Sequence, residues 1–207
     1  MIAIVDYGVG NLFSLKSSLA AIGQEAVVTA DREILAAASH VILPGVGAFG
    51  DAAKKLRDTG LDRVVIELAK QGKPLLGICL GMQMLLERSF EYGEHEGLGL
   101  IKGEIRPIEE TVPKGLKIPH IGWNALQLRG ENPIFKYIKD GDFVYFVHSY
   151  HGVACGDCVI ATAEYGATLT AAVAFGNVYG CQFHPEKSGE VGLSILRAFC
   201  ETEGRVC

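Results

Sequence analysis

An open, mostly parallel α/β sheet with helices on both faces, continued by an antiparallel C-terminal extension, is the fold class that this sequence predicts. Up to residue 97, short apolar runs alternate with helical patterns, as in sheets built from β-α-β units. From residue 97 onward, strand patterns follow one another with short turns between them. The chain has 207 residues, of which 49% are hydrophobic, which is enough for one large core. A single domain over residues 1–207 is therefore expected.

Four strands and four helices are predicted in the N-terminal half. Each strand is a short apolar run, and each helix has apolar residues spaced by three and four positions. Asp31 is a suitable cap for the second helix. We expect strands at 2–5, 26–28, 41–43 and 74–78, and helices at 12–22, 31–38, 51–70 and 80–88. This order implies a parallel sheet that is covered on both faces.

The C-terminal half reads mainly as strands. Gly176 and Asn177 separate the last two strands and are typical of a hairpin turn. One final helix is expected at about 190–201. The expected strands lie at 98–108, 123–128, 143–148, 159–163, 171–175 and 178–183.

Composition and charge exclude several classes of function. The net charge is −5 and basic residues form no tract, so nucleic-acid binding is not expected. No apolar stretch approaches the ~18 residues that span a bilayer, and the first residues lack a secretory pattern. The six cysteines are sparse, which favours reduced thiols over disulfides. We therefore expect a soluble, cytoplasmic protein without a cofactor.

Cys79 is the candidate nucleophile. It lies where a buried strand meets a helix, with Gly77 and Gly81 on either side. A sharp strand–turn–helix corner places a nucleophile in a strained conformation that only small neighbours allow. The corner also brings the sulfur to the carboxyl end of the sheet and to a helix N-terminus, which favours a thiolate. A buried structural cysteine is the alternative for this motif taken by itself.

His184 and Glu186 are the candidate base and its orienting acid. They follow the last predicted strand, and a spacing of two in an extended segment puts both side chains on one side. Glu186 can then accept the proton of one imidazole nitrogen while the other nitrogen faces Cys79. A surface turn with a polar pair is the alternative for these residues alone.

The oxyanion of an acyl-transfer reaction needs backbone N–H donors. Leu80 directly follows the nucleophile and offers one. The loop at 44–47 follows another strand end, and its residues Val46 and Gly47 can offer a second donor because glycines allow unusual backbone angles. A phosphate-binding loop is a weaker interpretation, since the motif lacks a third glycine and a Lys-Ser/Thr pair.

A metal site is not expected. Cys155 and Cys158 have Cys-x-x-Cys spacing, but the sequence contains no second cysteine pair. The three-residue offset of His148 and His151 would place them on opposite faces of a strand. A solvent-exposed turn is the expected structure around the two cysteines.

With these motifs in view, the chain resembles the class I, triad-type glutamine amidotransferases over essentially its whole length. The resemblance rests on residues 77–83 and 182–186. Segments 6–11, 44–49, 119–124 and 184–189 are similar to one branch, the glutaminase subunits of imidazole glycerol phosphate synthase. The resemblance implies that Cys79 attacks glutamine through a thioester, with His184 as base and then acid. The ammonia would pass to a (β/α)₈ barrel cyclase subunit, forming a heterodimer that makes imidazole glycerol phosphate and aminoimidazole carboxamide ribotide.

The resemblance also implies roles for further residues. Those matching the glutamine-binding positions are Gly45, Gln83, Glu91, Ser149 and Tyr150. Those matching positions that face the barrel are Asn11, Trp123, Asn124, Tyr145 and Lys187. Core packing of the aromatic residues and ordinary solvent exposure of Lys187 and Glu91 are the alternatives.

Three other functions stay open from the sequence. One is a triad amidotransferase that serves pyridoxal phosphate, purine or anthranilate synthesis. Another is a free-standing thiol hydrolase that acts on small amides or γ-glutamyl peptides. The third is a non-catalytic module on the same scaffold, which would have no chemical need for His184 and Glu186.

Overall fold

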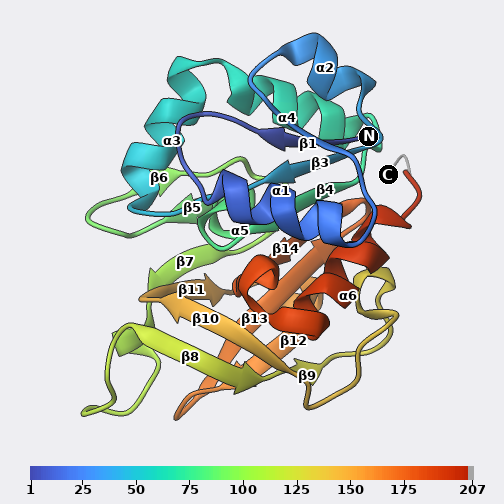
Figure 1. Ribbon diagram of the computed structural model, residues 1–207. Helices are drawn as coiled ribbons and strands as arrows, with labels where there is room; N and C mark the ends of the chain where they lie inside the picture. Colours follow the sequence, from blue (N-terminus) through green and yellow to red (C-terminus); the bar gives the residue numbers. More distant parts are fainter. Residues whose placement is uncertain (205–207) are drawn as a thin grey trace.

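The computed structural model describes residues 1–204 and is built around an eight-stranded sheet (Figure 1). The strands are, in spatial order, β2 (Ala26–Thr29), β1 (Ile2–Val5), β3 (His40–Leu43), β4 (Leu75–Ile78), β14 (Val178–Cys181), β13 (Thr168–Phe175), β12 (Val159–Glu164) and β9 (Gln127–Leu128). The pairs from β2 through β14 are parallel, and those from β14 through β9 are antiparallel. This arrangement confirms the predicted fold class. The hairpin at Gly176 and Asn177 is also confirmed, since it joins β13 to β14.

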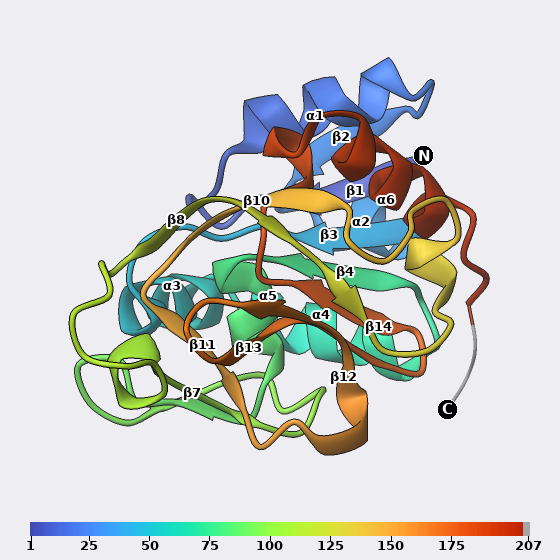
Figure 2. The same ribbon diagram turned by 90° about the horizontal axis from the view of Figure 1, so that it is seen from below.

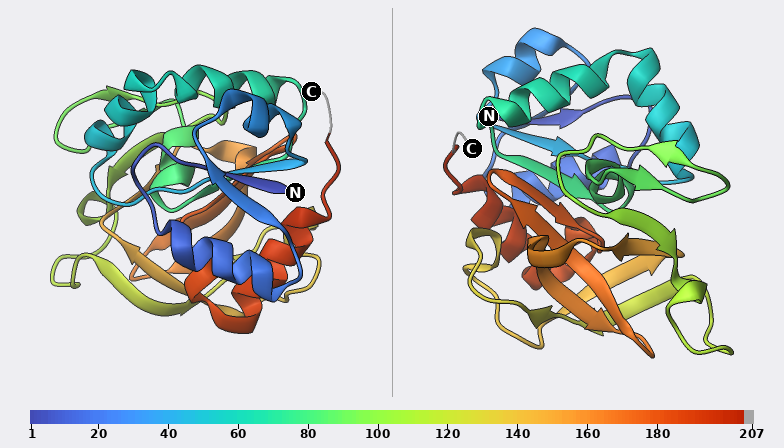
Figure 3. Two further views of the ribbon diagram at one scale, coloured as in Figure 1. Left: turned by 45° about the horizontal axis from the view of Figure 1, so that its top comes forward. Right: turned by 180° about the vertical axis from the view of Figure 1, so that it is seen from behind.

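Helices cover both faces of this sheet. The helices α1 (Leu12–Ala21) and α6 (Gly189–Cys200) lie side by side on one face (Figures 2 and 3). The other face carries α2 (Arg32–Ala37), α3 (Phe49–Asp58), α4 (Leu61–Lys70) and α5 (Leu80–Leu85). The alternation of side chains along β1 shows why two cores form. Ala3 and Val5 pack in the cluster with α2 to α5, whereas Ile2 and Ile4 pack in the cluster with α1 and α6.

Two smaller sheets complete the fold. One pairs β8 (His120–Ala125) with β10 (Phe143–His148) in antiparallel register, and its inner residues Val144 and Phe146 join the cluster of α1 and α6. The other has the order β11 (Tyr150–Val153), β7 (Glu104–Pro107), β5 (Arg88–Ser89) and β6 (His95–Glu96). Short 3₁₀ turns lie at Ile108–Glu110, Pro133–Phe135, Gly156–Cys158 and Pro185–Lys187.

Several predicted elements have different bounds. The helix expected at 51–70 is two helices, because Gly60 adopts a left-handed φ of 71° between them. The strand expected at 98–108 is only β7, since Gly99 and Gly103 have φ of 61° and 136° in the segment before it. The strand expected at 123–128 starts earlier as β8 and ends at Ala125, and β9 is a separate short strand. The strands β5, β6 and β11 were not predicted.

The cysteines found among residues 1–204 are free thiols, and Cys207 lies outside the described residues. The expectation of an exposed turn is wrong for Cys155, which is buried. Its sulfur occupies the space beside Gly103, where an added Cβ would lie only 2.6 Å from Sγ. Within the described range, no three His, Cys, Asp or Glu side chains are arranged to hold a metal ion. No helix formed by these residues is long and apolar enough to cross a membrane.

Candidate active site

Cys79 occupies the corner between β4 and α5. Its backbone angles are φ 54° and ψ −110°, a conformation that non-glycine residues rarely adopt. The Cys79 N–H donates to the carbonyl of Cys181 on the neighbouring strand β14 at 2.7 Å. The predicted strand–turn–helix corner is therefore confirmed, and the strained residue is the cysteine itself.

The glycines beside Cys79 are required by close backbone contacts. A Cβ at Gly81 would lie 1.9 Å from the carbonyl oxygen of Leu43, at the end of β3. A Cβ at Gly77 would lie 2.7 Å from the carbonyl carbon of Gly81. Neither contact is possible for a real side chain, so both positions allow the helix to start directly against the sheet.

His184 reaches the same end of the sheet from β14, which is the hydrogen-bonded neighbour of β4. Its Nδ1 lies 2.8 Å from Oε1 of Glu186, and both side chains are 3% exposed. The expected extended segment is wrong, because residues 185–187 form a 3₁₀ turn. The turn shortens the chain between the two side chains, so the imidazole and the carboxylate still meet.

Opposing effects set the pKa of His184. Burial disfavours the imidazolium, but hydrogen bonds to Cys79 and Glu186 and the charges of both groups outweigh it. Together they raise the pKa of His184 to about 9. Glu186 Oε2 is buried without a hydrogen-bond partner. The arrangement therefore favours a proton on the imidazole, which lies between the Cys79 sulfur and the Glu186 carboxylate.

The loop that follows β3 lies against the start of α5. A Cβ at Gly45 would lie 2.7 Å from the amide nitrogen of Gly81, so this contact also needs a glycine. Gly47 has a φ of 91°, and Val46 is 43% exposed. Leu80 is the first residue of α5, directly after Cys79. The three predicted oxyanion residues, Leu80, Val46 and Gly47, thus line one wall beside the sulfur.

A cavity of about 620 Å³ opens over Cys79 and His184. All the predicted glutamine-binding residues except Gly45 line it, and Gly45 lies close to Leu80 and Gly81. The cavity is also lined by Tyr92, Pro107, Glu109, Ile118 and Pro119, which were not predicted for the site. A volume of this size accommodates an amino-acid substrate.

Two of the predicted substrate residues are already held by the protein. Glu91 is buried, and its Oε2 accepts from the Phe49 N–H at 2.7 Å. Burial raises the pKa of Glu91, and that hydrogen bond opposes the shift. Gln83 donates through Nε2 to the Tyr150 carbonyl at 3.2 Å and to Gln182 Oε1 at 3.1 Å. Gln182 in turn donates to the Cys79 sulfur at 3.8 Å.

The residues predicted to face a partner separate into two groups. Trp123 is 55% exposed and meets the Tyr145 ring edge-on, and the Nζ of Lys187 lies 5.8 Å from the Tyr145 ring centre. By contrast, Asn11 caps α1 by accepting from the Ser14 N–H at 3.4 Å. Asn124 is half-buried and bonds within the chain. Only the first group presents its side chains together at the surface.

No role at the site was predicted for Gln182 or His120, although both lie in segments that carry the family resemblance. Gln182 is fully buried directly after β14, and His120 pairs with His148 across the β8/β10 sheet. A signal was available, since His148 ends a predicted strand beside Ser149 and Tyr150, and His120 lies in the segment 119–124 that carries the resemblance.

Comparison with known proteins places these residues in a family context. The sequence profile of the class-I glutamine amidotransferase family matches residues 3–202. A protein of Wolinella succinogenes called imidazole glycerol phosphate synthase subunit HisH is 47% identical and covers 97% of this chain and 99% of its own length. The subunit of the same name from Caldanaerobacter subterraneus is 48% identical, covering 97% and 98%. The one from Aquifex aeolicus is also 48% identical, covering 95% and 94%.

Solved structures show the same fold at lower identity. A crystal structure described as a glutamine amidotransferase is 22% identical and superimposes with a TM-score of 0.75 over 97% of this chain and 98% of its own. A chain in the structure of PurLQS from Thermotoga maritima gives a TM-score of 0.73 at 23% identity, with 96% of each chain covered.

Proposed function

This chain belongs to the class I glutamine amidotransferases, and we propose that Cys79, His184 and Glu186 hydrolyse the side-chain amide of glutamine. The observation that carries this proposal is the strained Cys79 corner, which shares one cavity with His184, whose imidazole is hydrogen-bonded to Glu186. The chain acts as the glutaminase subunit of imidazole glycerol phosphate synthase, releasing glutamate and ammonia.

The first half-reaction forms a thioester. The proton of the Cys79 thiol resides on His184 in the resting site, in keeping with the raised pKa of that imidazole, and the Cys79 thiolate attacks the amide carbon of glutamine. The resulting oxyanion faces the N–H groups of Leu80 and of the 46–47 segment, which stabilise the developing charge. The tetrahedral intermediate then collapses as His184 gives its proton to the departing nitrogen, which leaves as ammonia. The pKa of about 9 suits His184 to hold that proton until the C–N bond breaks.

The second half-reaction restores the thiol. Neutral His184 now takes a proton from a water molecule, whose oxygen attacks the thioester carbonyl. The same N–H groups face the second oxyanion. Collapse breaks the C–S bond, the sulfur regains a proton from His184, and glutamate leaves. Glu186 holds the imidazole in the required orientation and stabilises its positive charge in both halves.

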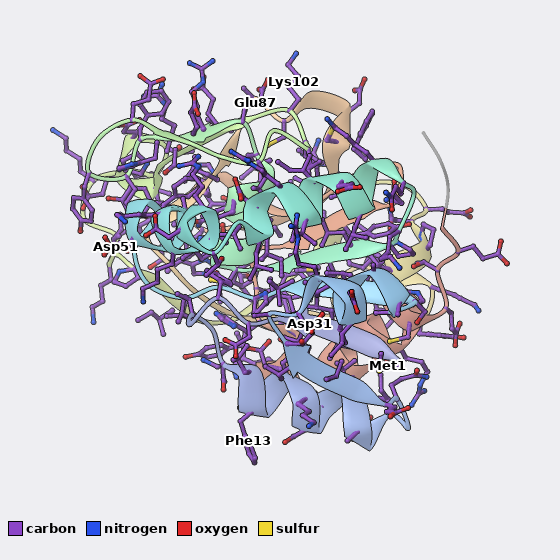
Figure 4. The ribbon with its side chains drawn as sticks, turned by 90° about the horizontal axis from the view of Figure 1, so that it is seen from above. Met1, Phe13, Asp31, Asp51, Glu87 and Lys102 are labelled. Carbon is purple, nitrogen blue, oxygen red and sulfur yellow. The ribbon has the colours of Figure 1, made fainter. Side chains whose placement is uncertain are left out.

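We propose that the ammonia passes to a (β/α)₈ barrel cyclase subunit bound at the β8/β10 face. Trp123, Ile121 and Phe143 are each more than half exposed on this two-stranded sheet. Exposed aromatic residues next to a cation are typical of interface centres. Phe13 at the start of α1 is 83% exposed and points away from the body of the protein (Figure 4). With this partner, the products would be imidazole glycerol phosphate and aminoimidazole carboxamide ribotide.

The alternative amidotransferases are less well supported. The relatives that match at 47–49% identity over nearly the whole chain all carry the same subunit name, whereas the PurLQS chain shares only 23%. We further propose that residues 1–207 form one amidotransferase domain that works in the cytoplasm.

The decisive measurement is glutamate release by the chain alone and with the cyclase subunit and its nucleotide ligand. We expect slow hydrolysis by the chain alone and a sharp rise with the loaded partner. Cys79→Ala should reduce the rate by at least about 10³-fold, because no other group supplies the thioester. Cys158→Ser is the matched control, since this half-buried cysteine lies outside the cavity.

Each part of the proposal can fail separately. Hydrolysis that persists in Cys79→Ala would overturn the thioester mechanism. A fast rate that is independent of the partner would instead leave the mechanism intact and point to a free-standing hydrolase. A heterodimer that survives Trp123→Ala together with Phe143→Ala at wild-type affinity would exclude the β8/β10 face as the docking surface.

A further inference from the structure

Two buried histidines outside the proposed triad form a hydrogen-bonded pair at the cavity, of which His148 lines the cavity and His120 does not. His120 on β8 and His148 on β10 stand opposite each other in the strand register, and they are 3% and 6% exposed. Nδ1 of His120 lies 2.9 Å from Nε2 of His148. The thioester chemistry proposed above uses neither residue. A direct bond between two buried imidazoles needs a reason, because each ring must hold its proton on one particular nitrogen.

The partners of the pair determine where each proton lies. Nδ1 of His148 is 2.9 Å from the Tyr150 carbonyl oxygen, which can only accept, so this nitrogen carries a hydrogen. At the other end, Nδ2 of Asn124 is 3.2 Å from Nε2 of His120. The orientation of the Asn124 amide is fixed, since its Oδ1 accepts from the Ala125 N–H and its Nδ2 donates to the Glu164 carbonyl. Nε2 of His120 is therefore an acceptor, and Nδ1 of His120 is the donor to His148.

Every group along this series of hydrogen bonds, from Asn124 to Tyr150, is then either a donor or an acceptor without conflict, and both imidazoles are neutral. A second proton on either ring would place two N–H groups against each other. The surroundings agree, since His120 stacks between Phe146 and Tyr165 at ring distances of 4.8 and 4.2 Å. Burial lowers the pKa of His120, and it lowers that of His148 to about 3.

The same series of hydrogen bonds continues from Tyr150 to Gln83. The Tyr150 carbonyl accepts from His148 and from Nε2 of Gln83 at 3.2 Å, so both of its lone pairs are used. The second hydrogen of that Nε2 goes to Oε1 of Gln182. With both amide hydrogens committed, Gln83 offers a cavity ligand only its carbonyl oxygen Oε1. That oxygen accepts no hydrogen bond from the rest of the described chain.

We propose that His120 and His148 are a neutral positioning pair that fixes the Tyr150 carbonyl and thereby turns the Gln83 carbonyl oxygen toward the substrate. This inference rests on glutamine being the substrate. The oxygen would then accept from an N–H group of glutamine, either its ammonium or its carboxamide. The pair sets the affinity for glutamine, and the reactivity of Cys79 toward a small electrophile does not depend on it.

The test compares two amide substitutions at one position. His148→Asn keeps a donor where Nδ1 lies and should retain the Tyr150 contact. His148→Gln places its amide near the Nε2 position and leaves the Tyr150 carbonyl short of one donor. In the complex with the cyclase subunit, we expect the KM for glutamine to rise about tenfold in His148→Gln and less than about threefold in His148→Asn. Alkylation of Cys79 by iodoacetamide should keep its wild-type rate in both.

His151→Gln is the matched control, because His151 is a buried histidine on β11 whose ring bonds Thr111 and takes no part in this series of hydrogen bonds. It should leave KM unchanged. Nitrogen-15 NMR of the wild-type protein gives a readout independent of activity, and both rings should show hydrogen on Nδ1. Equal KM values in the two His148 variants, or hydrogen on Nε2 of either ring, would overturn the positioning pair. Absence of glutamine hydrolysis in the wild-type complex would instead overturn the proposed function, and the NMR result would still decide the tautomers.

Discussion

The corner at Cys79 and the turn at His184 meet at one cavity, but different forces hold them. The corner is set by excluded volume, because Gly77 and Gly81 leave no room for a single added carbon. The turn is set by polar contacts, in which Ser188 Oγ donates to the His184 carbonyl at 2.7 Å and accepts from the Tyr145 N–H at 3.0 Å. The nucleophile should therefore be sensitive to added atoms, and the base to lost charges and donors.

The largest effect is expected from a change of charge in the turn. Glu186→Gln keeps the shape but removes the carboxylate that supports the imidazolium, so kcat should fall by about 10²–10⁴-fold. In the wild type, activity should be lost as the pH rises through about 9, where His184 loses its proton. Without the carboxylate the pKa of His184 is lower, so this alkaline limb should move to lower pH.

The pH profile of kcat/KM checks this prediction, and Glu190→Gln on the exposed start of α6 is its control. An alkaline limb that stays in place in Glu186→Gln would show that the carboxylate does not support the charge on His184.

A substitution of a glycine beside Cys79 should mainly reduce the stability of the fold. Gly81→Ala places a Cβ where the Leu43 carbonyl lies, so the free energy of unfolding should fall by about 3 kcal/mol or more. Gly47→Ala is the matched comparison, because that glycine has open space around it and only its φ of 91° is strained. It should cost about 1 kcal/mol. Urea unfolding measures the free energy of both variants. Equal losses would mean that the backbone angle, and not the lack of space for a Cβ, determines the cost of replacing these glycines.

The smallest effect is expected at the edge of the turn. Ser188→Ala removes the hydroxyl that links β10 to His184, leaving a buried N–H and a buried carbonyl with one partner fewer. We expect a loss of about 1–3 kcal/mol in unfolding free energy and a decrease in kcat of less than about tenfold. Ser39→Ala removes an exposed hydroxyl that donates to the Met1 carbonyl and lies 3.1 Å from Nδ1 of His40, and it should change stability by less than about 1 kcal/mol. Thermal unfolding of the two variants decides whether the link matters.

The same contrast explains what the sequence could predict. The corner was predictable because its cause is local, with glycines two residues before and after Cys79. The identity of the base and acid was predictable as well, but the extended path between them was not, since the 3₁₀ turn depends on contacts with β10. His120 and His148 are 28 residues apart and meet only through strand register. Cys155 was predicted to be exposed because Gly156 and Asp157 follow it, and its contact with the distant Gly103 cannot be read from the sequence.

The pairing of β4 with β14 determines at which stage of protein synthesis the active site can form. Cys79 directly follows β4, which is made early in synthesis, whereas His184 and Glu186 are translated about a hundred residues later. Because domains are made from the N-terminus at a finite rate, a growing chain carries the thiol for some time without its base. An enzyme that arranges its nucleophile and base in this way becomes reactive only when its synthesis is nearly complete, so truncated products release no ammonia.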